Sequence, residues 1–280
     1  MLGVTVVFMD NIILTWFAKH GTGDISRLMY AKRLFTAPLA ILGPTAGAAS
    51  LPFFASLYSR SRFADYASSV NRAVTRILSV ALMLTAAMFA LARPSVDLIF
   101  RGGSFSRDDG RLTALYFGIF TLSLALWASQ SIYSRAFFAA GQTLPPMRAG
   151  TIITALSIPL YWLLHQRFGV IGLAWASNLA IFIHTVTLAI LLHRRNMVSL
   201  GGLNRPELAK SLLAAAVSFA GVTLLLRVLP HSQTPTHPGD LLALTAGGLL
   251  WAGLCFGVLH LTGSTLPAQL LRRGAASPAV

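Results

Sequence analysis

The chain has 280 residues, of which 55% are hydrophobic and only 11% are charged. A soluble globular domain carries about 25% charged residues, so the composition excludes an ordinary soluble domain and predicts an integral membrane protein. Lys and Arg number 22 against 8 Asp and Glu, but no segment has the basic groove with interleaved aromatic residues that binds nucleic acid. The single cysteine, Cys255, excludes an intrachain disulfide.

Long apolar runs indicate helices that cross the membrane. A helix needs roughly 20 apolar residues to cross about 30 Å of hydrocarbon, whereas the strands of a membrane barrel alternate over about ten residues. The sequence therefore predicts an all-α, polytopic bundle of about eight transmembrane helices. The expected spans are Leu2–Phe17, Leu34–Tyr58, Val74–Leu91, Leu112–Ala139, Ala149–Leu164, Val170–Leu192, Leu212–Leu229 and Leu241–Leu261.

The first expected span contains an acidic residue. Leu2–Phe17 has no basic leader and no small-residue cleavage site, so it is interpreted as a membrane segment and not as a signal peptide. Asp10 and Asn11 lie in its middle, where an ionisable side chain costs at least ~2.5–3.5 kcal/mol and normally faces a partner or a cavity. Two interpretations stay open: a structural contact, or a site for a monovalent cation or proton that couples transport.

The second expected span has the composition of a broken helix. Proline kinks a helix, and small residues let helices approach closely. The pattern alone favours a kinked packing helix slightly over the broken helices with which transporters form substrate sites. The residues that carry this pattern are Pro38, Gly43, Pro44, Gly47 and Pro52.

Basic residues precede this span. Lys32 and Arg33 lie directly before it, and Arg27 lies further upstream. They are either cations that extend to the membrane interface or a cationic patch that faces a central cavity. Arginine presents a planar fork matched to phosphate oxygens, and lysine adds a point charge. Arg33, Lys32 and Arg27 are therefore the candidate residues for binding an anionic headgroup.

The segment between the third and fourth spans predicts a turn followed by a capped helix. Gly102 and Gly103 supply the turn, and Ser106 or Asp108 is the expected N-cap. Asp108 and Asp109 are adjacent carboxylates. Because the helix dipole favours acids near an N-terminus, capping is favoured over metal or acid–base chemistry.

The charge distribution predicts cytoplasmic termini, but only from the second half of the chain. After residue 140, most Lys and Arg fall on the side of the termini, as the positive-inside rule requires. In the first half, cations gather on the opposite side, which suggests a role other than topology. These cations are Lys19, Arg27, Lys32, Arg33, Arg93, Arg101, Arg107 and Arg111.

No catalytic or cofactor motif is present in the sequence. The seven histidines are scattered without metal-ligand spacing, and no Walker loop, G-x-S-x-G or G-x-G-x-x-G occurs. His184, within the sixth span, is interpreted as a helix-packing residue. The sequence therefore predicts a protein that is not an enzyme, with no metal, cofactor or nucleic-acid partner.

Two blocks share the order and spacing of motifs found in one family. The first block is Tyr30-Ala31-Lys32-Arg33-Leu34, Pro38, Gly43 and Leu51-Pro52. The second block is Phe100, Gly103, Phe105-Ser106, Asp109, Phe137-Phe138-Ala139, Thr143 and Pro145. These blocks resemble the MurJ/MviN family, the lipid II flippases of bacterial cell-wall synthesis.

The resemblance implies the multidrug/oligosaccharidyl-lipid/polysaccharide exporter superfamily. Its transporters place two six-helix lobes around a central cavity, and MurJ adds two trailing helices. Residues 1–195 are then expected to form the second lobe, and residues 196–280 the trailing helix pair and a short basic tail. The first lobe is missing from the sequence. The chain is therefore expected to be a fragment or split gene product, or to work with an amino-terminal lobe or a second copy of itself.

The implied function is movement of lipid II, the undecaprenyl-diphosphate-linked peptidoglycan precursor, across the bacterial inner membrane by alternating access. The resemblance implies that Arg33, Lys32 and Arg27 bind the substrate, while the lipid tail lies along the trailing helices among membrane lipids. Two alternatives stay open: an exporter of another polyprenyl-linked glycan, and a non-transporting scaffold of a cell-wall complex.

The resemblance also implies an ion-coupling role for Asp10 and Asn11. The ion site of some family members draws on polar residues of a second span, which matches Thr151–Leu164 here. In this chain that span offers Thr154 and Ser157 but no acid or amide. This departure puts sodium coupling in question.

Overall fold

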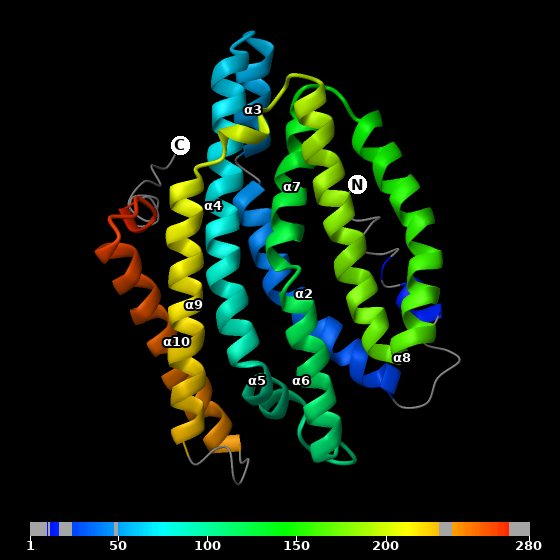
Figure 1. Cartoon of the computed structure of the whole chain (residues 1–280), viewed down its shortest axis with the longest axis vertical. Coiled ribbons are helices and arrows are strands. Elements are labelled where there is room, and N and C mark those ends of the chain that lie inside the picture. The colour runs from blue at the N-terminus through cyan, green and yellow to red at the C-terminus, as the bar shows by residue number, and fades with distance from the viewer. Residues whose placement is uncertain (1–9, 11, 17–23, 48–49, 230–236, 269–280) are drawn as a thin grey trace, which may run out of the picture.

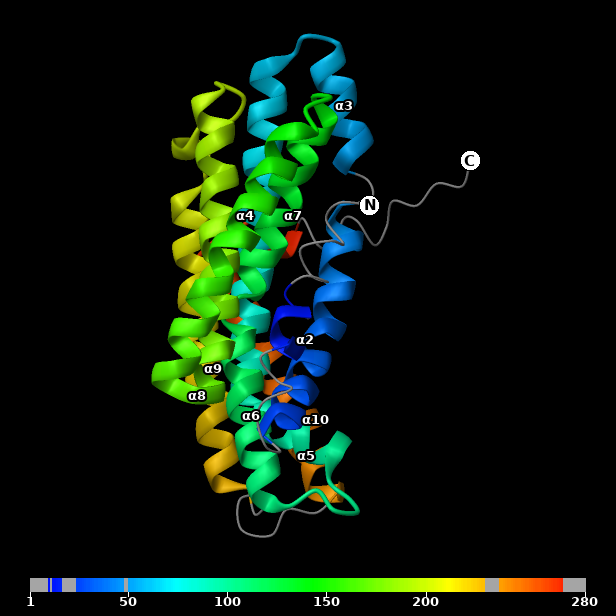
Figure 2. The same cartoon turned by 90° about the vertical axis from the view of Figure 1, so that its right-hand side faces the viewer.

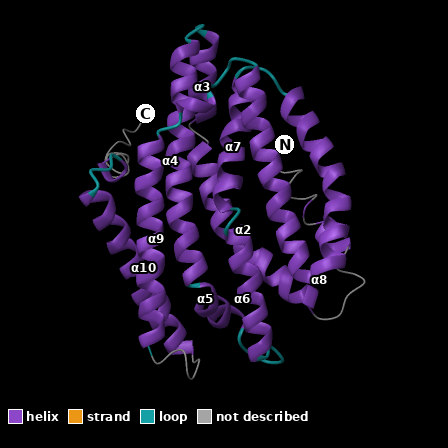
Figure 3. Ribbon diagram, viewed as in Figure 1, coloured by secondary structure: helices purple, strands orange, loops and turns teal. Residues whose placement is uncertain are grey.

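The computed structural model describes residues 10, 12–16, 24–47, 50–229 and 237–268. Every regular element in these residues is helical (Figures 1 and 3). The elements are α2 (Asp24–Gly47), α3 (Ser50–Ser59), α4 (Phe63–Ala90), α5 (Ala92–Phe100), α6 (Arg107–Thr121), α7 (Leu124–Ala139), α8 (Leu144–Arg194), the 3-10 turn η1 (Leu200–Gly202), α9 (Arg205–Val228) and α10 (His237–Leu261). The predicted all-α bundle is confirmed.

Five helical stretches in the described residues are long and apolar enough to cross a membrane. They are Phe63–Ala90, Arg107–Ala139, Leu144–Arg194, Arg205–Val228 and Pro238–Leu261. The 51-residue α8 is two helices, because Gly169 interrupts it with φ 60° and ψ −142°. The two arms run in opposite directions (Figure 1), so the expected separation into Ala149–Leu164 and Val170–Leu192 holds.

The second expected span differs from the structure at its start. Helix α2 begins at Asp24, ten residues before the expected start at Leu34, so Lys32 and Arg33 lie inside a helix and not in front of one. The polar first turns of α2 are helical because Arg27 pairs with Asp24 on its own helix and with Asp109 on α6. Helix α2 runs to Gly47 and α3 runs from Ser50. Residues 48 and 49 lie outside the described part of the chain, so the choice between a kinked and a broken helix stays a prediction.

The fourth expected span also contains a break. Helices α6 and α7 meet at Leu122 and Ser123, whose backbone N–H groups bond back to Ile119 and Phe120 at 3.2 and 3.0 Å. At the start of α6, the N-cap is Ser106. This is one of the two expected residues, the other being Asp108. Its hydroxyl accepts from the backbone N–H of Asp109, whose carboxylate accepts from the backbone N–H of Ser106. This reciprocal capping box satisfies two backbone donors at once.

The main core lies between α2, α4, α6, α7 and α8. Its fully buried large side chains include Phe35, Phe54, Tyr66, Phe120, Phe137 and Tyr161. Figure 2 shows α2 and α3 along one face of the bundle and the arms of α8 along the other. Helices α9 and α10 pack outside α4 over a second, smaller core that includes Met83, Ala214 and Cys255. The expected boundary between residues 195 and 196 stays a prediction.

Candidate functional site

A buried ion pair joins three separate parts of the bundle. The Lys32 ammonium on α2 donates to the Asp10 carboxylate and, at 3.1 Å, to the hydroxyl of Ser177 on the second arm of α8. The Ser177 hydroxyl donates to the same carboxylate at 3.0 Å, and the Tyr161 hydroxyl of the first arm donates to its other oxygen. Asp10 is 8% exposed and Lys32 is 4% exposed, so both charges are removed from solvent.

Aromatic rings complete the surroundings of the Lys32 ammonium. Its Nζ lies 4.5 Å from the ring centroid of Phe120, 5.7 Å from that of Phe35 and 6.0 Å from that of Trp127. An ammonium over an aromatic face is attracted by the ring quadrupole, more strongly where water is excluded. We call Asp10, Lys32, Tyr161, Ser177 and these three rings the Asp10–Lys32 site.

A cavity of about 30 Å³ adjoins this site, which is enough room for a water molecule. His184 and Trp127 line it, and their ring nitrogens have no hydrogen-bond partner among the described residues. Thr154 and Ser157 also line it, so the structure brings the polar residues of the expected coupling span to Asp10. The lining residues are Asp10, Ile13, Trp127, Gly150, Ile153, Thr154, Ser157, Tyr161, Ser177, Ala180, Ile181 and His184.

The structure separates the two consecutive cations of α2. Successive residues of a helix point about 100° apart, and here Lys32 is buried whereas Arg33 is exposed. Arg33 is therefore available to an external ligand, while the charge of Lys32 is already balanced by Asp10. Asn11 lies outside the described residues.

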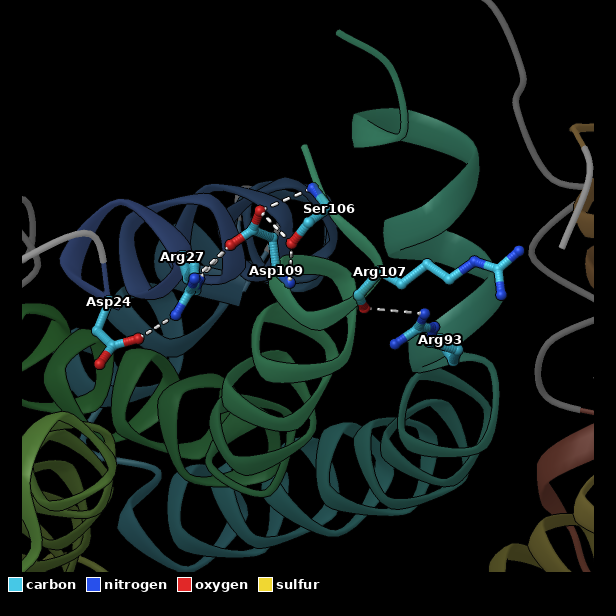
Figure 4. Close-up of polar contacts among 6 residues, drawn as sticks. All are labelled: Asp24, Arg27, Arg93, Ser106, Arg107 and Asp109. Atoms are coloured by element: carbon cyan, nitrogen blue, oxygen red, sulfur yellow. Dashed lines mark hydrogen bonds and ion pairs between the residues drawn. The ribbon is translucent and has the colours of Figure 1, made fainter. Parts of the chain in front are cut away.

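Arg27 belongs to a second polar cluster at the start of α2 (Figure 4). Its guanidinium pairs with Asp24 and, at 2.5 Å, with Asp109. Asp109 also accepts from the backbone N–H and the hydroxyl of Ser106, both at 2.7 Å. The capping box of α6 therefore also positions the carboxylate that receives Arg27 from α2. Arg27 keeps a side-chain exposure of 25%.

A third cluster was not found by sequence reasoning. Asp97 on α5 accepts from Arg93 at 2.7 Å and pairs with Arg101 at 2.9 Å. Arg101 also pairs with Asp240 on α10 at 2.8 Å. The spacing of Arg93, Asp97 and Arg101 at four-residue intervals signals the first two pairs, but nothing in the sequence signals Asp240. Arg27, Arg93 and Arg101, three of the cations that gather in the first half of the chain, thus each pair with an acidic side chain.

Among the described residues, no group of three His, Cys, Asp or Glu side chains lies close enough to hold a metal ion. The Asp10–Lys32 site offers a buried carboxylate, an ammonium and hydroxyls. Such groups bind ions and exchange protons, and in membrane proteins they mark transport pathways.

The arrangement of long apolar helices is that of a polytopic α-helical membrane protein. A solved structure, "Lipid II flippase MurJ, inward closed conformation", superimposes with a TM-score of 0.72 at 20% identity, covering 92% of this chain and 52% of that one. The family model "Lipid II flippase MurJ" matches residues 1–243. The chain belongs to the lipid II flippase MurJ family, which confirms the resemblance drawn from the two sequence blocks.

Curated relatives give the same family. "Probable lipid II flippase MurJ" of Bdellovibrio bacteriovorus is 24% identical over 274 residues, covering 97% of this chain and 52% of the relative. The protein of the same name from Rhizobium meliloti is 26% identical over 284 residues, covering 99% and 52%. The chain therefore spans about half the length of these relatives.

Proposed function

We propose that this chain forms the carboxy-terminal half of a lipid II flippase. In this proposal it takes part in moving undecaprenyl-diphosphate-linked peptidoglycan precursor across the bacterial inner membrane by alternating access. The observation that carries the proposal is the MurJ family match over residues 1–243, supported by the similar fold. A transporter of this kind is not an enzyme, because it breaks no covalent bond of its substrate.

Arg33 is proposed as the residue that contacts the substrate diphosphate. It is exposed on α2, and its guanidinium can bind two phosphate oxygens at once. Lys32 and Arg27 are proposed to act beside it. Since each is held by carboxylates, their contribution is to fix α2 and to add positive potential near the headgroup.

Asp10, with Asn11, is proposed to couple transport to an ion gradient. The Asp10 carboxylate links the first segment, α2 and both arms of α8 through Lys32, Tyr161 and Ser177. A change in its charge would weaken contacts to three elements together. This is the kind of two-state element through which ion binding can bias a conformational equilibrium.

Transport is proposed to require a further lobe. Alternating access moves one repeat against another around a central site, and this chain spans about half of each full-length relative. The further lobe is either an amino-terminal lobe or a second copy of the chain.

Complementation of a MurJ-depleted bacterium tests the proposal. The chain is expressed alone and together with the amino-terminal half of the Rhizobium meliloti relative. Its presence in the membrane is checked in each case. We expect growth and lipid II exposure on the outer leaflet with both halves. If the folded, membrane-inserted chain does not restore growth, either alone or together with that amino-terminal half, the flippase proposal is wrong. Rescue by a chain shown to be monomeric would refute the need for a further lobe.

A further inference from the structure

The Lys32 ammonium occupies the position that a bound monovalent cation would take. Its oxygen ligands are the Asp10 carboxylate and the Ser177 hydroxyl, and the Phe120 ring lies 4.5 Å away. A carboxylate, a hydroxyl and aromatic faces are the groups with which proteins bind alkali-metal and organic ammonium ions. Here the cation is part of the chain itself, because the ammonium is the end of the Lys32 side chain.

The charges of the site are already balanced. It contains one carboxylate and one ammonium, and both are buried. A second cation would leave the site with an uncompensated positive charge away from water, which is strongly unfavourable. The intact site therefore lacks the uncompensated negative charge that an exchangeable cation needs.

We propose that Lys32 is a tethered cation that fills a monovalent-cation site built around Asp10. Removing the ammonium opens this site to an exchangeable alkali-metal ion or primary alkylammonium ion. The inference deepens the proposed coupling role of Asp10. Only one part of it rests on that role: if Asp10 couples transport, the coupling ion is a proton, because Lys32 already fills the cation position. The binding properties themselves do not depend on flippase activity.

The geometry indicates where the exchangeable ion would bind. In Lys32→Ala, the Asp10 carboxylate keeps its contacts with Tyr161 and Ser177, because both come from α8. The truncated side chain leaves space beside the cavity of about 30 Å³ lined by Thr154 and Ser157. An ion entering there meets the carboxylate, hydroxyl oxygens and the aromatic rings that now surround the ammonium.

Thermal unfolding of the full chain in detergent tests this proposal. The wild type and Lys32→Ala are measured in choline chloride, sodium chloride, potassium chloride and butylammonium chloride at equal ionic strength. The pH is the same, mildly alkaline value in all four salts. We expect the midpoint of the wild type not to depend on the cation. Lys32→Ala should unfold earlier in choline and regain stability, in a saturable way, with at least one of the smaller cations.

The double variant Asp10→Asn/Lys32→Ala is the matched control. It has the same space but no carboxylate, so its stability is not expected to respond to the cation. Lack of any cation response in folded Lys32→Ala would overturn the proposal, as would an equal response in the double variant. If Lys32→Ala does not fold in choline, radioactive sodium binding to the wild type decides. Saturable sodium binding to the wild type that is lost in Asp10→Asn would refute the proposal that Lys32 fills the site. Absence of sodium binding to the wild type would support that proposal.

Discussion

Arg101 and Asp240 form a 2.8 Å ion pair that joins α5 to α10. Asp240 is fully buried and Asp97, the second partner of Arg101, is 3% exposed. Arg101 therefore lies between two carboxylates from helices that are about 140 residues apart in the chain. This contact fixes one end of the outer helix pair to the main bundle, at the side where α9 ends and α10 begins (Figure 1).

Arg101→Ala is expected to destabilise the protein by about 3–5 kcal/mol, because it removes the cation paired with the buried Asp240, whereas Asp97 keeps its pair with Arg93. The measurement is reversible unfolding in mixed detergent micelles. Arg107→Ala serves as control, since the side chain of Arg107 is exposed and its loss is expected to cost less than about 0.5 kcal/mol. Equal effects of the two substitutions would show that the Arg101 pairs contribute little.

Ser106→Ala is expected to cost about 0.5–2 kcal/mol, as for the loss of other N-cap hydroxyls. The hydroxyl of Ser106 both caps α6 and donates to Asp109, which receives Arg27. Hydrogen exchange should therefore increase at the start of α2 as well as at the start of α6. Ser104→Ala, in the exposed loop just before, is the control. Increased exchange confined to α6 would show that the capping box and Arg27 are not linked.

Hydropathy and turn residues predicted the all-α fold, a separation of two spans between Leu164 and Val170, and an N-cap at Ser106 or Asp108, of which Ser106 is the observed one. These features depend on local sequence. The start of α2 was placed ten residues too late, because its polar first turns are stabilised by Asp109, 82 residues away from Arg27. Asp10 was expected to need a partner, but the sequence could not identify Lys32 as that partner. Asp240 was missed because its partner, Arg101, comes from a distant helix.

Arg33→Ala in the assembled flippase is expected to reduce lipid II translocation by about tenfold or more. The estimate follows from losing one or two hydrogen bonds to a charged group, each about 1.5–3 kcal/mol. Arg33→Lys should also impair transport, because it keeps the charge but loses the bidentate geometry. Arg60→Ala, at an exposed arginine after α3, should transport normally. Normal translocation by Arg33→Ala at wild-type expression would exclude a substrate-binding role.

Asp10→Asn is expected to remove the dependence of transport on the membrane gradient and also to lower stability, because the buried Lys32 ammonium loses its counter-charge. The amide keeps the size of the side chain but cannot carry the negative charge that Lys32 now balances. The measurement is lipid II translocation with and without an ionophore. Asp65→Asn is the control, because Asp65 forms an exposed pair with Arg62. Unchanged gradient dependence in Asp10→Asn would make Asp10 a purely structural residue.

Two glycine substitutions are expected to have opposite effects on stability. Gly169 has φ 60° and ψ −142°, a conformation strained for other residues by about 1–3 kcal/mol, so Gly169→Ala should destabilise the turn between the arms of α8. Gly253 lies within α10, and a methyl group there meets no atom within 4 Å. Gly253→Ala should therefore stabilise α10 by up to about 1 kcal/mol through helix propensity. The measurement is the unfolding midpoint of each variant in detergent, compared with that of the wild type. If Gly169→Ala is as stable as wild type, the reversal of α8 does not depend on glycine at this position.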